Sequence, residues 1–479
     1  MWQAIQSRET GRTPSNSFAN QLKSRRISSL QLSNRKDFVS PHRASVNSLQ
    51  VDLTEGRYLL SGASDGSAAV FDTQRATDSE ASGLIAKHKC IFSVDKGHEH
   101  GHRFAVSSAV WYPIDTGLFV TGSFDHLIKV WDTNTAQAVV DFKMPGKVYR
   151  TAMSSLAMSH TLIAAGTEDV QVRLCDIASG AFSHTLSGHR GMLLFYFSFE
   201  HSLTHKQATE LSCCFHGTQD GVMSVEWSTS SEWVLYTGGC DGAIRFWDIR
   251  RAGCFRVLDQ SVTQLGVRPP ILKHTAVNSK VSAEKSSSGG KNRLKTLQSK
   301  HTGSQSMKGS SSVKASVEKS RQKRLHPGML STLDRATAHY GVVTGLKATN
   351  DGMYLLSAGS DSRIRLWDTQ SGCNTLLNFE TGRLHTSKAI QMATSDDPAL
   401  LFVPCMKTVK AFGMWSGRTT LMFRGHYESV NTCCFNSTDQ ELYTSGADRQ
   451  ILVWSPGGSL EGEMDQDEEV AEDKDNWSD

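Results

Sequence analysis

The chain has 479 residues, of which 38% are hydrophobic, and it contains 39 glycines but only 10 prolines. This composition is typical of a turn-rich all-β domain with polar extensions. The longest apolar run, Met192 to Phe199, is much shorter than the ~20 residues that a membrane-spanning helix requires. The ten cysteines occur singly or as adjacent pairs and never as Cys-x-x-Cys. This usage favours reduced thiols in an intracellular protein over a disulfide or zinc framework.

The N-terminal segment, residues 1–36, begins with a short amphipathic pattern. Trp2, Ile5 and Gln6 stand at positions i, i+3 and i+4, which predicts one face of a helix over residues 1–11. Taken alone, these few residues favour a frayed terminus over a stable helix.

A repeated pattern begins after this segment. Each complete copy has a leading His, a strand, a turn that carries Asp, and a strand that ends in Trp-Asp or a weaker equivalent. A repeat of ~40–45 residues with this signature predicts four-stranded blades of a β-propeller. We therefore predict an all-β, seven-bladed WD-repeat (WD40) propeller, with blades one to four in residues 37–258 and blades five to seven in residues 337–456. The repeat positions are Asp65, Asp125, Trp131, Asp169, His189, Asp241, Trp247, His339, Asp361, Trp367, His426, Asp448 and Trp454.

The repeat positions predict a buried polar chain in each complete blade. The leading His can bond the turn Asp, while a strand Ser or Thr and the Trp indole N–H complete the chain. Buried polar groups are tolerated when they are paired in this way. Blade six, from Lys388 to Trp415, has lost its turn Asp and leading His and is the weakest copy.

Blade four contains an anomalous insertion at residues 191–219. The step from His189 to Val222 is 33 residues, whereas the matching step in blade seven, from His426 to Val430, is four. Removing the insertion leaves a normal blade start. A lid or partner-binding loop is one interpretation, and a retained or mispredicted exon segment is the one that we favour.

Two further segments lie outside the repeat pattern. Residues 259–336 contain 15 Lys or Arg and four Asp or Glu, whereas residues 461–479 contain ten Asp or Glu and one Lys. Neither can offset the entropy of ordering by burial, so we expect a disordered basic Ser/Lys-rich loop at 259–336 and a disordered acidic tail at 457–479. The run Lys319, Arg321, Lys323 and Arg324 is a candidate nuclear-import cluster, with a solvated loop as the equally weighted alternative.

Motifs that carry catalysis are absent from the sequence. It contains no phosphate-binding Gly-x-x-x-x-Gly-Lys loop, no Gly-x-Ser-x-Gly elbow and no His-Glu-x-x-His motif. The cluster His98, His100 and His102 has ligand-like composition, but one of these residues is expected to be the leading His of blade two. We therefore predict a binding platform rather than an enzyme, with no cofactor and no metal.

Several strings are more specific than the generic repeat, and they resemble the Cockayne syndrome A family in a plant-type version. They include Trp111-Tyr112-Pro113-Ile114-Asp115-Thr116-Gly117, Trp131-Asp132-Thr133-Asn134-Thr135, Ser7-Arg8-Glu9-Thr10-Gly11 and an acidic tail that holds Trp477. The similarity covers nearly the whole chain apart from the two insertions. It implies a non-catalytic substrate receptor of a cullin-4 RING ubiquitin ligase in transcription-coupled nucleotide excision repair and the UV response, located in the nucleus.

The resemblance also implies partners and docking residues. The implied partners are the large subunit of the UV-damaged-DNA-binding complex as adaptor, cullin-4 and the RING subunit through it, the Cockayne syndrome B-type ATPase and stalled RNA polymerase II. Blade four alone ends in Trp-Asp-x-Arg, whereas blades two and five have Asn134 and Gln370 at the last position. Helix-in-groove docking of an N-terminal segment is the second family feature. The expected adaptor-facing residues are Trp2, Ile5, Arg8, Asp248 and Arg250, on one edge of the propeller, which leaves the other broad face and the central channel for substrate.

Two alternatives remain open at this stage. Arg250 could simply pack between blades, and the chain could be a chromatin- or nucleic-acid-binding scaffold outside ubiquitin ligation. Phosphate contacts by the basic loop would give steeply salt-dependent DNA binding, which a salt titration with duplex DNA would detect.

Overall fold

A computed structural model describes residues 2–12, 14–79, 85–190, 221–263, 336–380, 382–385, 388–396 and 399–457. The insertion at 191–219, most of the basic loop with Lys319, Arg321, Lys323 and Arg324, and nearly all of the acidic tail lie outside these residues. In the described ranges no helix is long and apolar enough to span a membrane.

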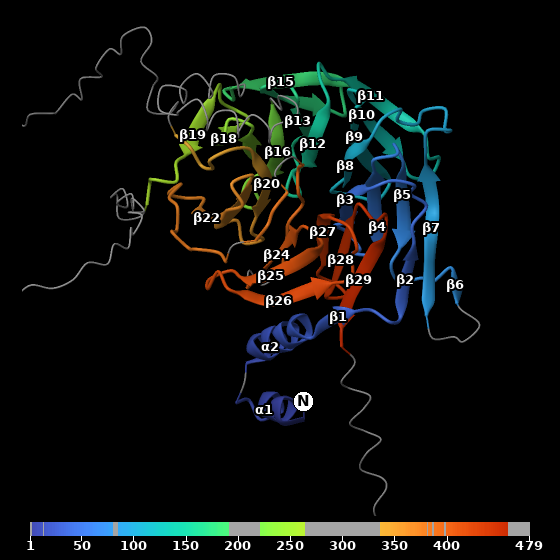
Figure 1. Ribbon diagram of the computed structural model, residues 1–479, viewed down its shortest axis with the longest axis vertical. Coiled ribbons are helices and arrows are strands. Elements are labelled where there is room, and N and C mark those ends of the chain that lie inside the picture. Colours follow the sequence, from blue (N-terminus) through green and yellow to red (C-terminus); the bar gives the residue numbers. More distant parts are fainter. Residues whose placement is uncertain are drawn as a thin grey trace, which may run out of the picture. The chain divides into compact units, whose positions relative to one another are not determined.

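The predicted propeller is confirmed by seven blades of antiparallel strands in the described residues, of which the first and the last belong to one ten-stranded sheet (Figure 1). Blade one contains β3 (Val46–Val51), β4 (Tyr58–Ala63), β5 (Ala68–Asp72) and β7 (Ala86–Val94), with the short β6 (Asp78–Ser79) beside β7. Blade two contains β8 (Val106–Trp111), β9 (Leu118–Ser123), β10 (Leu127–Asp132) and β11 (Ala138–Lys143). Blade three contains β12 (Val148–Met153), β13 (Leu162–Thr167), β14 (Gln171–Asp176) and β15 (Ala181–Ser187). Blade four contains β16 (Val222–Trp227), β17 (Val234–Gly239), β18 (Ile244–Asp248) and β19 (Cys254–Leu258).

The remaining blades follow the basic loop. Blade five contains β20 (Val343–Ala348), β21 (Tyr354–Gly359) and β22 (Ile364–Asp368), and bridges of Asn374 to Thr263 and Trp367 extend it. Blade six contains β23 (Ala393–Thr394), β24 (Leu400–Cys405), β25 (Thr408–Gly413) and β26 (Thr419–Arg424). Blade seven contains β27 (Val430–Asn436), β28 (Glu441–Gly446) and β29 (Ile451–Pro456). Because Thr263 joins blade five, the expected loop boundary at residue 259 is a few residues too early.

The predicted polar chain is present in blades two, four, five and seven. In blade two the Trp131 indole N–H donates to Thr121 Oγ1 at 2.7 Å, His102 Nε2 lies 2.7 Å from the same oxygen, and His102 Nδ1 lies 2.8 Å from Asp125. The other three chains are Trp247–Thr237–His189–Asp241, Trp367–Ser357–His339–Asp361 and Trp454–Thr444–His426–Asp448. Their distances fall between 2.6 and 3.0 Å. Each His, Asp, Trp and Ser or Thr side chain of these four polar chains thus has a hydrogen-bond partner, which low-dielectric surroundings require.

The other three blades depart from this chain, blade one least, since its His42 keeps the contact with a strand Ser, Ser61. In blade one, Ser67 links His42 to Asp65, and Phe71 stands at the Trp position. Blade three has Met144, Ala165 and Cys175 in one apolar cluster at the His, Thr and Trp positions, and its Asp169 pairs with Arg173 at 2.8 Å. Blade six has Val403 and Phe412 at the Thr and Trp positions. In blades three and six the Thr and Trp positions are both apolar, which avoids the partly satisfied network that would destabilise a core.

The N-terminal strands close the ring. The first-blade strands and the last-blade strands lie side by side in Figure 1 (blue and red). β1 (Leu30–Leu32) pairs with β29 as the outer strand of blade seven, and β2 (Lys36–Val39) bridges β29 and β7. The expected boundary at residue 36 is therefore wrong, because residues 30–36 belong to the propeller. Closure pairs sheet edges that would otherwise be open.

The blade-four insertion leaves and re-enters the fold at equivalent positions of a normal blade. Before the insertion, the Arg190 backbone N–H donates to Asp241, just as the Tyr340 N–H of blade five donates to Asp361. After it, the Gly221 carbonyl oxygen accepts from the Cys240 N–H, just as the Val342 carbonyl oxygen of blade five accepts from the Ser360 N–H. Gly221 has φ +112°, and a Cβ there would lie 2.2 Å from the Thr167 carbonyl oxygen, so only glycine fits. The register that the sequence predicted for this blade is thus retained around residues 191–219.

Replacing Trp367 with Ala should lower the free energy of unfolding by about 3–5 kcal/mol, because it removes a fully buried indole. It also leaves Ser357 without its indole donor. Chemical denaturation of the purified protein measures this change. A melting temperature equal to that of the wild type would show that the strand register is wrong.

Acidification should destabilise the fold between pH ~6.5 and ~4 through buried histidines. Burial lowers the pKa of His42 to about 4, against an ordinary value of 6.5, and burial also lowers the pKa of His339. The unfolded chain therefore binds protons in this window that the folded chain rejects, so stability falls as the pH decreases. Urea unfolding across this range should show a shallower pH dependence for His42→Asn than for the wild type. Equal slopes would contradict this assignment.

Candidate functional site

Two helices precede the propeller. α1 spans Trp2–Glu9, as the sequence predicted for residues 1–11, and α2 spans Ser15–Ser28 after Pro14. α2 was not predicted, because its 14 residues include few apolar side chains and these do not form one continuous face. The Arg8 guanidinium lies 5.5 Å from the Phe18 ring centre and so links α1 to α2. Ile5 is partly buried, while the side chain of Trp2 lies outside the described residues.

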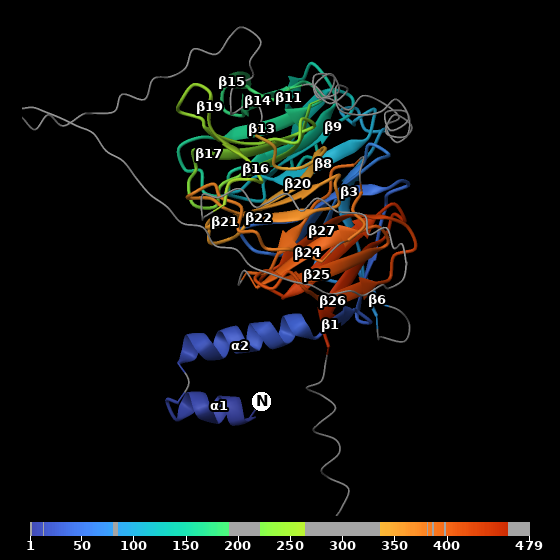
Figure 2. The ribbon, with the colours of Figure 1, turned by 60° about the vertical axis from the view of Figure 1, so that its left-hand side comes forward.

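Only the C-terminal end of α2 is held by the propeller. Ile27 is buried in a cluster with Phe402, Phe423 and Trp454. Arg26 donates to the Asp439 carbonyl oxygen at 3.1 Å, and Lys23 lies 3.8 Å from Asp396. Figures 1 and 2 both show α2 beside β1, next to blades six and seven. The C-terminal end of α2 is therefore an anchored base, from which α1 and most of α2 project into solvent.

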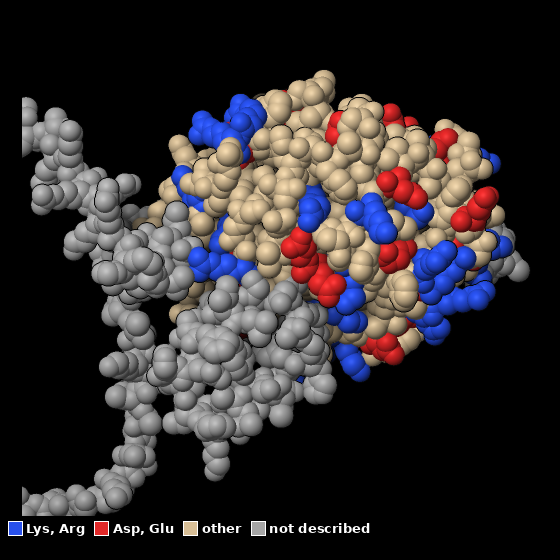
Figure 3. All heavy atoms as spheres, turned by 90° about the horizontal axis from the view of Figure 1, so that it is seen from above, with Lys and Arg blue, Asp and Glu red and all other residues tan. Residues whose placement is uncertain are grey.

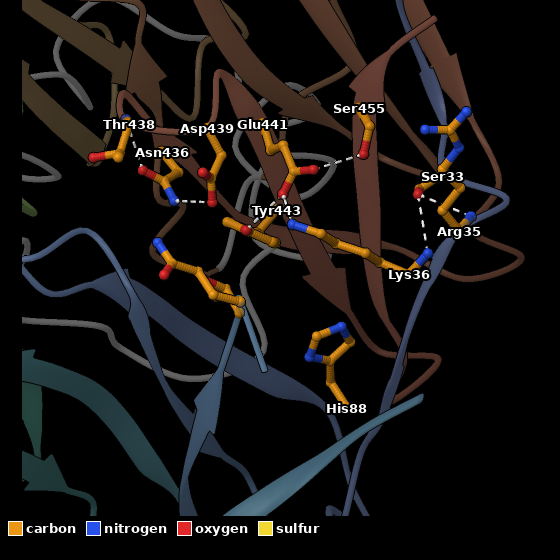
Figure 4. Close-up of polar contacts among 12 residues, drawn as sticks. Ser33, Arg35, Lys36, His88, Asn436, Thr438, Asp439, Glu441, Tyr443 and Ser455 are labelled. Carbon is orange, nitrogen blue, oxygen red and sulfur yellow. Dashed lines mark hydrogen bonds and ion pairs between the residues drawn. The ribbon is translucent and has the colours of Figure 1, made fainter. Parts of the chain in front are cut away.

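A buried ionic network reinforces the closure strands that carry this base (Figure 4). Lys36 Nζ lies 2.9 Å from Glu441 Oε2, which also accepts from the Tyr443 hydroxyl at 2.9 Å. Ser455 donates to Glu441 Oε1 at 2.9 Å. Burial, together with the neighbouring Glu441 carboxylate, raises the pKa of Tyr443 well above its ordinary value. The carboxylate is thus satisfied by three donors, as a buried charge requires.

Asp248 and Arg250 form a second feature, at the end of β18 in blade four. Arg250 Nε and Nη2 donate to the two Asp248 carboxylate oxygens at 2.9 and 2.8 Å. This hydrogen bond holds the pKa of Asp248 below its ordinary value. The guanidinium also lies 5.2 Å from the Trp233 ring centre, and 54% of the Arg250 side chain remains exposed. Arg250 is therefore a fixed, oriented cation at the surface rather than a residue packed between blades.

A surface hollow of about 530 Å³ adjoins Arg250. Its walls include Met158, His160, His184, Trp233 and Ile249 from blades three and four. Met158 is 90% exposed. An aromatic and aliphatic surface around an oriented Arg has the composition of protein interface anchors.

The two features share a face but not an edge. In an antiparallel four-stranded blade the loop between the first and second strands and the loop between the third and fourth strands lie at the same end of the sheet. α2 contacts first-to-second-strand loops of blades six and seven through Asp396 and Asp439, and Arg250 contacts Trp233 in the corresponding loop of blade four. The structure therefore does not bring Ile5 and Arg8 into contact with Asp248 and Arg250. The two features therefore do not lie on one edge of the propeller, as expected. They lie on one broad face, which we call the docking face.

The central channel opens toward this same face. A cavity of about 360 Å³ is lined by the middle and end of the inner strands, including the paired Glu226 and Lys347, 3.0 Å apart, and Arg150. The Glu226 carboxylate raises the pKa of Lys347. The channel cavity thus opens on the docking face and not on the opposite face. This differs from the expectation that the central channel is left for substrate.

The histidine cluster of blade two is assigned by the structure. His102 is the leading His, bonded to Asp125, while His98 and His100 lie in the preceding loop. Among the described residues, no group of three His, Cys, Asp or Glu side chains is placed to hold a metal ion. Figure 3 shows basic and acidic side chains interspersed on the side of the molecule seen from above.

Comparisons with known proteins agree with this architecture. The family described as "WD domain, G-beta repeat" matches residues 89–132, 209–248, 330–368 and 417–455. The chain is 82% identical over 480 residues to the WD repeat-containing protein ATCSA-1 of Arabidopsis thaliana, with full coverage of both chains. It is 26% identical over 191 residues to Radiation-sensitive protein 28 of Saccharomyces cerevisiae, covering 40% of this chain and 30% of that protein. It is 29% identical over 152 residues to a ribosome biogenesis protein WDR12 homolog of Aedes aegypti, covering 31% and 28%.

Replacing Lys36 with Met should destabilise the propeller by about 3–5 kcal/mol, because it leaves the buried Glu441 carboxylate without its cation. Differential scanning calorimetry measures the effect. The control Lys23→Met removes a more exposed and longer ion pair and should change stability by less than ~1 kcal/mol. Equal effects of the two substitutions would show that the closure network does not hold the ring.

Proposed function

This chain belongs to the Cockayne syndrome A family of WD-repeat proteins, and from that membership we propose how it works in the cell. It is the non-catalytic substrate-recognition subunit of a cullin-4 RING ubiquitin ligase. It acts in transcription-coupled nucleotide excision repair and in the response to UV damage. The full-length identity of 82% to ATCSA-1 supports this assignment.

The observation that carries the proposal is the docking face itself. It combines a helix pair anchored at one end with an oriented Arg at the other side of the same face. A helix whose surface is solvated in the isolated chain can bury that surface in a groove of a partner. A guanidinium already fixed by Asp248 and Trp233 loses little conformational entropy when it binds. The two features together fit one large adaptor protein.

The adaptor that we propose is the large subunit of the UV-damaged-DNA-binding complex. Trp2, Ile5 and Arg8 contact it through α1, and Asp248 and Arg250 contact it through blade four. Cullin-4 and the RING subunit join through the adaptor. The Cockayne syndrome B-type ATPase and stalled RNA polymerase II are the proposed clients, and the nucleus is the proposed location. The separation of the two contact groups favours an adaptor that spans several blades.

Deletion of residues 1–11 should abolish co-precipitation of the adaptor while the propeller melts normally. The deletion removes α1 but leaves α2, β1 and the Lys36–Glu441 pair. Normal melting with intact adaptor binding would contradict the docking role of α1.

Substitution of Arg250 by Ala should weaken adaptor binding by at least ~2 kcal/mol, the usual effect of truncating an Arg anchor. The matched control is Arg251→Ala, which removes a neighbouring cation that lies 3.6 Å from Asp248 and is 74% exposed. Surface plasmon resonance with the purified adaptor compares them. Equal losses for the two variants would show that only net charge matters here.

A further inference from the structure

The face opposite the docking face carries a set of side chains in equivalent positions. The residue after each leading His occupies this position in five blades, namely Arg43, Arg103, Arg190, Tyr340 and Tyr427. In the first four, the backbone N–H donates to the turn Asp at 2.6–3.2 Å. In these four blades the turn Asp therefore also fixes the backbone of the residue after the leading His. We call these five residues the display positions.

The display positions present cations and aromatic rings to solvent. Arg43 and Arg103 are exposed, and Tyr340 and Tyr427 are 69% and 61% exposed. Two more exposed cations, Arg363 and Arg449, lie in second-to-third-strand loops of the same face. The side chains of four turn Asp residues, Asp125, Asp241, Asp361 and Asp448, are nearly inaccessible against their His partners. The exposed carboxylates in the loops of this face, Asp95, Glu99 and Glu428, are fewer than its exposed cations, so its accessible charge is positive on balance.

An apolar cluster lies between the display positions in the described residues. Tyr149, Met223, Cys240 and Val342 form a buried cluster where the inner strands of blades three to five begin. Phe124 lies edge-on to Tyr149 at 6.1 Å, and Phe104 beside Arg103 is exposed. The channel cavity is lined by other residues, toward the docking face. This face therefore offers apolar and aromatic contacts beside the display positions.

We propose that the display positions bind an acidic segment of a partner protein that also carries aromatic side chains. Arg43 and Arg103 on blades one and two would pair with its carboxylates, while Tyr340 and Tyr427 on blades five and seven would pack against its rings. Charge complementarity and exposed aromatic rings are the recognition elements of such a segment. The proposal rests on the proposed function, since this face lies opposite the face that an adaptor covers, and the segment would then belong to a ubiquitination substrate.

The test uses the purified full-length chain and a fluorescein-labelled synthetic peptide that alternates Glu pairs with Phe. Arg43→Gln combined with Arg103→Gln should weaken binding about tenfold, as expected for the loss of two partly exposed ion pairs. Tyr340→Ser combined with Tyr427→Ser should weaken it at least fivefold. These side chains are exposed and the backbone bonds to Asp remain, so melting temperatures should not change.

The matched control is Lys143→Gln combined with Arg424→Gln, which removes two exposed cations from the outer strands β11 and β26. Binding by this variant should stay within twofold of the wild type, and a peptide with Gln in place of Glu should bind at least tenfold more weakly. The proposal is overturned if the control variant loses as much affinity as the display variants, or if the wild-type chain does not bind the Glu peptide. Adaptor binding by every variant should remain unchanged, which separates this result from a failure of the docking assignment.

Discussion

The pairing of β1 with β29 is the contact on which the rest of the structure depends. It joins residues from the two ends of the chain, Leu30 to Pro456 and Leu32 to Trp454, and so turns a row of sheets into a closed ring. β2 then ties blade seven to blade one, and Lys36 places its ammonium group on the buried Glu441 carboxylate. Without this closure the polar edges of two strands would be open to water or to other chains.

Closure also determines where the N-terminal helices lie. α2 runs directly into β1, and Ile27 and Leu30 are buried in the same cluster as Trp454. The strand that completes blade seven is therefore also the base from which α1 and α2 project. A docking element built in this way is oriented by the fold, so less ordering entropy remains to oppose binding. Stability of the ring and presentation of the docking helices depend on the same few contacts.

The polar chain of each complete blade has a similar double role. The His and Asp side chains satisfy one another in the core, and in blades two, four and five the same carboxylate also bonds the backbone N–H of the residue after the His, at the surface. Blades three and six, which have apolar residues at these positions, gain packing instead. The propeller thus presents two chemically different faces, one with α2 and Arg250 and one with exposed Arg and Tyr side chains.

The sequence predicted the propeller, its blade register and the polar chains, because these features are set by local spacing between His, Asp and Trp. It placed the propeller start too late, because β1 has only three residues and its partner is more than 400 residues away in the chain. It missed α2, whose helical conformation depends on anchoring at Ile27 rather than on one apolar face. It could not place Arg250 relative to α1, since that relation depends on which ends of different sheets share a face.

The central claim is that one face of the propeller docks an adaptor and that the adaptor does not contact the opposite face. Hydrogen–deuterium exchange of the purified chain, alone and with the large subunit of the UV-damaged-DNA-binding complex, tests it most directly. The account predicts slower exchange in α1, in α2 and in the loops around Trp233 and Arg250, with no change around Arg43, Arg103 and Tyr340. Protection of the latter residues, with none in α1 or near Arg250, would contradict it.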